Sequence, residues 1–175
     1  MRNLSFPNPV PLLNEEKIIA VDADVVTCFV KAEQSDHARS LNPEGEKIYQ
    51  IGLTYGFRVL PTVEEQLRAI PDVRNRLEHD ESLRRLFLLV NLNYQEFIPR
   101  IEKRTLELFP HHNDKSDCRI LAEAEAIDSS VLLTLDVNFQ KHLRSRTSTP
   151  LLKPSQFDIP YGTRRKFQQI PPTQN

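Results

Sequence analysis

The 175-residue chain lacks tryptophan and contains only two cysteines, one methionine and four glycines. The cysteines, Cys28 and Cys118, stand at unrelated positions, which excludes a disulfide-rich scaffold and a cysteine-based zinc motif. The net charge of −1 indicates no strongly charged partner. No apolar run is long enough to cross a membrane, and none is typical of a signal peptide. We therefore expect a cytoplasmic protein with one folded domain and two reduced cysteines in its core.

Short apolar runs alternate with segments of helical periodicity. Strands are predicted at residues 17–26, 57–60, 130–135 and 151–152, and helices at 44–55, 61–70, 72–92, 94–108 (interrupted at Pro99) and 117–128. This alternation predicts an α/β fold, a three-layer α/β/α sandwich around a mainly parallel sheet. We expect residues 1–16 to form an extended arm, residues 17–159 the folded domain, and residues 160–175 a flexible polar tail.

Acidic residues stand where two predicted strands end. Asp22 and Asp24 interrupt the apolar stretch KIIAVDADVV, and Asp136 follows the run VLLTL. Since ligands of parallel sheets bind at the carboxyl ends of the strands, Asp22 and Asp136 are expected to converge there. Asp117 opens the helix before the second of these strands, where the helix dipole favours a carboxylate. Taken singly, Asp117 and Asp136 could be ordinary first-turn and strand-end residues. Converging carboxylates suit Mg²⁺ or Mn²⁺, which support phosphodiester hydrolysis.

Three segments together resemble the PIN domain family. They are Asp22-Ala-Asp24-Val-Val, Asp117-Cys-Arg-Ile-Leu-Ala-Glu-Ala, and Thr134-Leu-Asp136-Val-Asn138-Phe. The resemblance covers about residues 17–157 and implies a metal-dependent endoribonuclease that cuts single-stranded RNA. Toxin-type members of the family imply a protein antitoxin as partner. The apolar helical residues between 82 and 108 are expected to be mostly core, and some of them could receive such a partner or form a homodimer face.

The resemblance also implies roles for individual residues. Asp22, Asp117 and Asp136 would bind Mg²⁺ or Mn²⁺, together with a glutamate on the helix after the second strand. We favour Glu65 over Glu64, because the neighbours of Glu65 at the family's spacing are apolar. Three further residues would contact these ligands and not the metal itself: Asp24, Thr134 and Asn138.

Basic residues gather late in the chain, with seven lysines and arginines against one aspartate over residues 140–175. Among them Lys141, Arg144 and Arg146 are candidates to bind RNA phosphates. His111 and His112 are predicted to lie in a solvated loop, since adjacent histidines do not easily face one metal ion.

Two alternatives remain open. A phosphatase of the haloacid-dehalogenase type also begins with a strand ending in Asp-x-Asp, so that Asp22 would be a nucleophile and Asp24 a general acid. Its motifs stand in another order, however, because Thr134 follows Asp117 here. The other alternative is a PIN-fold module that binds RNA or protein without cutting.

Overall fold

The computed structural model describes residues 17–89 and 94–159, and the predicted arm and tail lie outside the described residues. Five strands are described: β1 (Ile19–Val21), β2 (Phe57–Val59), β3 (Phe87–Leu89), β4 (Val131–Leu133) and β5 (Leu151–Leu152). They form one sheet in the order β3-β2-β1-β4-β5, and every neighbouring pair is parallel. The predicted α/β fold with a parallel sheet is confirmed.

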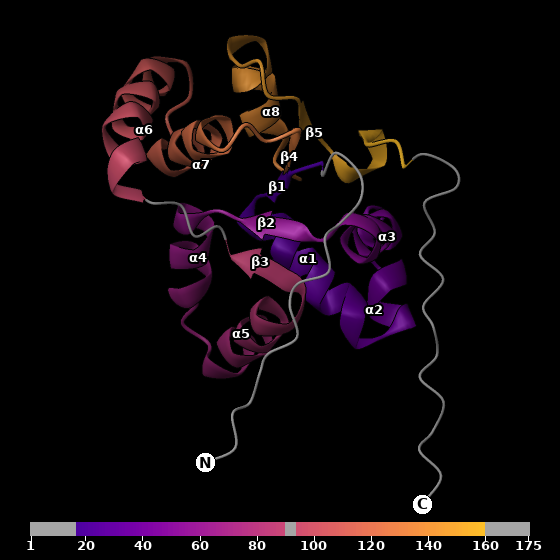
Figure 1. The fold of residues 1–175 in the computed structure, drawn as a ribbon. Helices are drawn as coiled ribbons and strands as arrows, with labels where there is room; N and C mark the ends of the chain where they lie inside the picture. The colour runs from indigo at the N-terminus through magenta and orange to yellow at the C-terminus, as the bar shows by residue number, and fades with distance from the viewer. Residues whose placement is uncertain (1–16, 90–93, 160–175) are drawn as a thin grey trace, which may run out of the picture.

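Helices cover both faces of this sheet. They are α1 (Ala23–Gln34), α2 (Asp36–Ser40), α3 (Gly45–Tyr55), α4 (Pro61–Arg68), α5 (Val73–Leu86), α6 (Tyr94–Leu108), α7 (Lys115–Ala126) and α8 (Val137–Leu143). Figure 1 shows α6, α7 and α8 on one side of the sheet and α1, α2 and α3 on the other. The three predicted layers are therefore present. Among the described helices, none has both the length and the hydropathy needed to cross a bilayer.

The first strand is shorter than the prediction of residues 17–26. It ends at Val21, and Asp22 caps the amino end of α1. Val25 and Val26 are fully buried, but they belong to the helix. A short run of buried apolar residues fits a strand or a helix equally well, so periodicity could not place this boundary.

The middle of the chain differs more from its prediction. Residues 72–92 were predicted as one helix, but α5 ends at Leu86 and β3 follows directly. Phe87–Leu89 form a strand because they pair with β2, and such tertiary contacts override local propensity. Helix α6 runs through Pro99, which is exposed, and so it is not interrupted there. Helix α7 begins at Lys115, two residues before its predicted start.

The core lies between the sheet and its helices, and both cysteines are buried in it as free thiols. One charged side chain is also fully buried, that of Glu123 in α7. Its carboxylate accepts hydrogen bonds from the backbone N–H of Thr62 at 3.1 Å and from the Thr62 hydroxyl at 2.7 Å. These bonds satisfy an otherwise unpaired N–H at the start of α4. They fasten the start of α4 to α7.

Candidate functional site

Asp22 and Thr134 join the ends of two neighbouring strands. Asp22 follows β1, and its Oδ1 accepts a hydrogen bond from the backbone N–H of Ala23 at 2.7 Å. Its Oδ2 accepts a hydrogen bond from the hydroxyl of Thr134, which follows β4, at 2.9 Å. Asp22 is 7% exposed and Thr134 is fully buried. Because β1 and β4 are parallel neighbours, this bond lies at the carboxyl edge of the sheet.

Asp24 and Asp136 are fixed to the loop between β4 and α8. The Oδ2 of Asp24 accepts a hydrogen bond from the backbone N–H of Leu135 at 3.1 Å. The backbone N–H of Asp136 donates to the hydroxyl oxygen of Thr134 at 3.0 Å. The Asp136 side chain is exposed and caps α8, with its Oδ1 accepting from the N–H of Asn138 at 2.6 Å. The loop therefore holds Asp136 beside the start of α1.

Asp117 lies in the first turn of α7 and contacts a buried histidine. The helix is capped by Asp114, whose Oδ1 accepts from the backbone N–H of Asp117 at 3.3 Å. The Oδ2 of Asp117 lies 2.7 Å from the Nε2 of His112. The Nδ1 of His112 lies 3.0 Å from the Nδ1 of His142, and its ring stacks on Phe139.

The solvated loop predicted for the two histidines is therefore wrong for His112, which is only 6% exposed. His111, its neighbour, is exposed. A carboxylate oxygen can only accept, so the Nε2 of His112 carries the proton that is donated to Asp117. No pattern in the sequence indicates the contact between His112 and His142, which lies 30 residues further along the chain.

Burial and mutual repulsion perturb the acids that these contacts bring together. The pKa of Asp22 is raised from 3.8 to about 7, mainly by burial and then by the charge of Asp24, with Asp117 contributing less. Burial also raises the pKa of Asp24 and that of Asp117, and in both cases the charge of Asp136 adds to the effect. The charges of Asp24, Asp117 and Asp136 thus each act on another of the four carboxylates, and Asp22 is acted on by two of them. We refer to Asp22, Asp24, Asp117 and Asp136 as the aspartate cluster.

The two candidate glutamates lie differently on α4. Glu65 is exposed, whereas Glu64 is half-buried and forms an ion pair with Arg68. The next residue, Gln66, contacts the start of α7, where its Nε2 donates to the Ser116 hydroxyl at 2.7 Å. The Oε1 of Gln66 is buried and has no hydrogen-bond partner within the described part of the chain. The assignment of Glu65 as a ligand stays a prediction. Gln66 is the α4 side chain that bonds to Ser116, the residue directly before Asp117.

The donor chemistry of the cluster fits a hard divalent cation, because it consists of carboxylate oxygens. The Oδ1 of Asp24 is buried and lacks a hydrogen-bond partner among the described residues. A divalent cation would satisfy this oxygen and offset the repulsion that raises the pKa of Asp22. Within residues 17–89 and 94–159, no three acidic, histidine or cysteine side chains are already arranged to hold a metal ion. Binding would therefore require the carboxylates to turn toward one another.

Of the predicted RNA-binding residues, Lys141 lies in the last turn of α8, and Arg144 and Arg146 follow the end of that helix. Lys141, Arg144 and Arg146 are all exposed. The backbone carbonyl of Arg146 accepts a hydrogen bond from Arg104 of α6 at 2.6 Å. Helix α8 has seven residues, which separate this end from Asp136 by roughly 10 Å.

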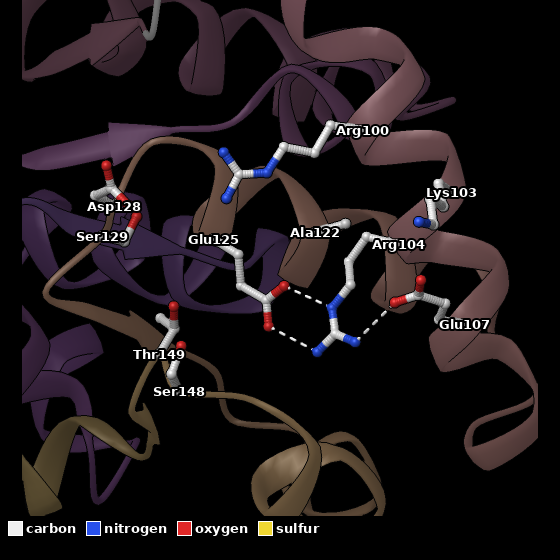
Figure 2. Close-up of a pocket in the computed structure, with 10 residues that line it drawn as sticks. All are labelled: Arg100, Lys103, Arg104, Glu107, Ala122, Glu125, Asp128, Ser129, Ser148 and Thr149. Atoms are coloured by element: carbon white, nitrogen blue, oxygen red, sulfur yellow. Dashed lines mark hydrogen bonds and ion pairs between the residues drawn. The ribbon is translucent and has the colours of Figure 1, made fainter.

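Arg104 also lines a cavity of about 540 Å³, drawn in Figure 2. Ser129 and Thr149 in its wall precede β4 and β5, so the cavity lies at the amino edge of the sheet, opposite the aspartate cluster. Arg104 forms two bonds with Glu125, at 2.7 and 3.1 Å, and a third with Glu107. The cavity is therefore separate from the acidic site.

Comparisons with known proteins say little of this site. No protein-family model matches the sequence, and curated proteins provide no significant match. Among solved structures, the chain is similar to FitAcB from Neisseria gonorrhoeae, with a TM-score of 0.47 and 12% identity over 80% of this chain and 100% of that chain. So slight a likeness concerns the path of the backbone alone. The aspartate cluster has to be judged on its own geometry.

Proposed function

We propose that the chain is a Mg²⁺- or Mn²⁺-dependent ribonuclease that hydrolyses phosphodiester bonds of single-stranded RNA. The observation that carries this proposal is that four aspartates at the carboxyl edge of β1 and β4 lie near enough for their charges to interact. Two of them are tied to the same loop, through the bond of Asp22 to Thr134 and that of Asp24 to Leu135. An all-carboxylate donor set favours Mg²⁺ and Mn²⁺ over metals that prefer nitrogen or sulfur.

In this proposal the aspartate cluster would hold the cation, with Glu65 as a further candidate ligand. Bound there, a divalent cation would lower the pKa of a water molecule and offset charge on the phosphate. The chain's own groups orient the ligands. Thr134 bonds to the Oδ2 of Asp22 and His112 to the Oδ2 of Asp117, and these contacts would steady the two carboxylates as they turn toward the cation. Such outer partners commonly govern metal affinity.

The test begins with metal binding. Wild-type protein, treated with EDTA and dialysed, is titrated with Mn²⁺ in a calorimeter, beside a variant carrying Asp22→Asn and Asp136→Asn. The matched control is Asp128→Asn, since Asp128 is exposed at the opposite edge of the sheet. We expect wild type and control to bind Mn²⁺ and the double variant to lose binding. Equal binding by all three proteins would show that the aspartate cluster does not hold the Mn²⁺.

Cleavage is measured next, on a labelled single-stranded RNA with Mn²⁺ or with EDTA. Wild type and Asp128→Asn should cut the RNA only with Mn²⁺, and the double variant should not cut it. The same geometry would serve a module that holds a cation and RNA without cutting. Mn²⁺ binding without cleavage of any single-stranded RNA would establish that alternative and refute the ribonuclease.

A further inference from the structure

Two cavities flank the aspartate cluster. One, of about 560 Å³, lies beside α1, and its wall includes Asp24, Lys31, Leu41, Asn42 and Leu135. The other, of about 450 Å³, lies at the starts of α7 and α8, and its wall includes Asn113, Asp114, Lys115, Asn138 and His142. We call them the α1 cavity and the α7–α8 cavity.

The loop that carries Asp136 separates the two cavities. Leu135, which directly precedes Asp136, lines the α1 cavity, and Asn138, two residues after Asp136, lines the α7–α8 cavity. Asp24 lies in the wall of the first cavity. Asp117 contacts His112, which lies in the wall of the second. A linear molecule that crosses the cluster would therefore have one cavity on each side.

The two cavities have similar chemistry. Each has one exposed lysine in its wall, Lys31 in α1 and Lys115 at the start of α7. Neither lysine forms an ion pair or hydrogen bond with another described residue. Each cavity also has a surface for a base: Leu41, which is 70% exposed, in the first, and the exposed imidazole of His142 in the second. Bases of single-stranded RNA commonly pack on rings and apolar side chains.

We propose that the cavities are nucleotide subsites, one on each side of the phosphodiester that meets the aspartate cluster. This inference rests on the proposed ribonuclease and adds the groups that hold the strand. Four carboxylates repel a phosphate backbone, so a strand that crosses them needs cations on both sides. Lys31 and Lys115 are placed to supply these, and volumes of about 450 and 560 Å³ are in the range of sites that enclose small molecules.

The test measures RNA binding by fluorescence anisotropy. The probe is a labelled single-stranded RNA of about eight nucleotides, within the usual length range of such sites. All proteins carry Asp22→Asn, so that the probe is not cut, and all measurements contain Mg²⁺. Into this background we introduce Lys31→Gln, Lys115→Gln or both. The matched control is Lys103→Gln, which changes an exposed lysine in the wall of the Figure 2 cavity at the opposite edge of the sheet.

Salt dependence gives a quantitative expectation. A phosphate contact with single-stranded RNA contributes about 0.7 to the slope of log affinity against log salt, or about five-fold in affinity near 0.1 M salt. Each lysine variant should therefore lose about 0.7 in slope, and the double variant about 1.4. Lys103→Gln should leave the slope unchanged. Unchanged slopes for Lys31→Gln and Lys115→Gln would overturn the inference, and so would an equal loss for Lys103→Gln.

Cleavage by protein with an intact Asp22 separates this inference from the function on which it rests. If Mn²⁺-dependent cleavage occurs and neither lysine variant changes RNA binding, the ribonuclease is supported and the subsites are refuted. If both lysine variants lower the salt slope of RNA binding and no single-stranded RNA is cut, the subsites are supported and the ribonuclease is refuted.

Discussion

Asp22→Asn removes the carboxylate whose burial costs the fold most. Asp22 is 7% exposed, and its pKa of about 7 lies well above the ordinary value of 3.8. In the metal-free protein the folded state therefore holds this proton more tightly than the unfolded chain does. The free energy of unfolding of the wild type should fall as the pH rises from about 4 to about 7, and this contribution should be constant above that range.

The size of the effect follows from the pKa. A rise of about three units corresponds to roughly 4 kcal/mol of destabilisation above pH 7. Compared with the neutral carboxyl, asparagine keeps an oxygen for the N–H of Ala23, but it places an amide opposite the Thr134 hydroxyl and so loses a neutral hydrogen bond worth about 0.5–1.5 kcal/mol. The variant should thus be more stable than metal-free wild type by about 2.5–3.5 kcal/mol near pH 8. Near pH 4 it should be less stable, because the wild-type carboxyl is then neutral.

Urea unfolding followed by circular dichroism in EDTA, near pH 4, 6 and 8, measures this difference. Asp114→Asn is the matched control, because Asp114 is an exposed cap and asparagine caps helices as well as aspartate does. The control should stay within about 0.5 kcal/mol of wild type at each pH. Mn²⁺ at about 1,000 times its dissociation constant should stabilise the wild type by about 4.1 kcal/mol and reverse the order. An Asp22→Asn protein that is equally destabilised at every pH would refute the reasoning.

Three further changes test other parts of the structure. His112→Ala should weaken Mn²⁺ binding about ten-fold by freeing Asp117, whereas His111→Ala, beside it, should not; calorimetry measures both. Glu65→Gln should weaken Mn²⁺ binding more than Glu64→Gln does, because Mn²⁺ prefers carboxylate ligands and Glu64 already pairs with Arg68; equal binding by both variants in calorimetry would remove Glu65 from the ligand set. Arg104→Ala should lower the free energy of unfolding by about 2 kcal/mol, because the partly buried Glu125 loses the partner that donates two bonds to it. Urea unfolding measures this, and no change would mean that the Arg104–Glu125 pair does not stabilise the fold.

The places of the main acidic residues in the fold could be predicted because each one borders an element with a clear signal. Asp22 and Asp136 follow apolar strand runs, and Asp117 precedes a strongly apolar helix face. Their convergence then follows from topology, because the carboxyl ends of parallel strands meet at one edge. Asp24 was predicted to support the ligands, and the structure places it within the electrostatic cluster itself.

The surrounding groups could not be predicted, because their partners are remote in sequence. His112 is recognisable only once His142, Phe139 and Asp117 surround it, and Gln66 depends on Ser116, which is 50 residues away. Gln66 does carry one local signal, its position three residues after the buried Val63 on the inward face of α4. The two glutamates before it attract attention first, because carboxylates are the usual ligands of Mg²⁺ and Mn²⁺.

The arrangement of donors around the aspartate cluster argues that its charges serve a purpose other than stability. The Thr134 hydroxyl lowers the pKa of Asp22 and the His112 ring lowers that of Asp117, yet both pKa values remain raised. The hydrogen bonds thus orient the carboxylates and only partly offset their burial. Replacing buried charges with neutral side chains of similar size is often neutral or stabilising, so the fold itself does not require them. A divalent cation would relieve the repulsion that remains, provided that the carboxylates turn toward one another.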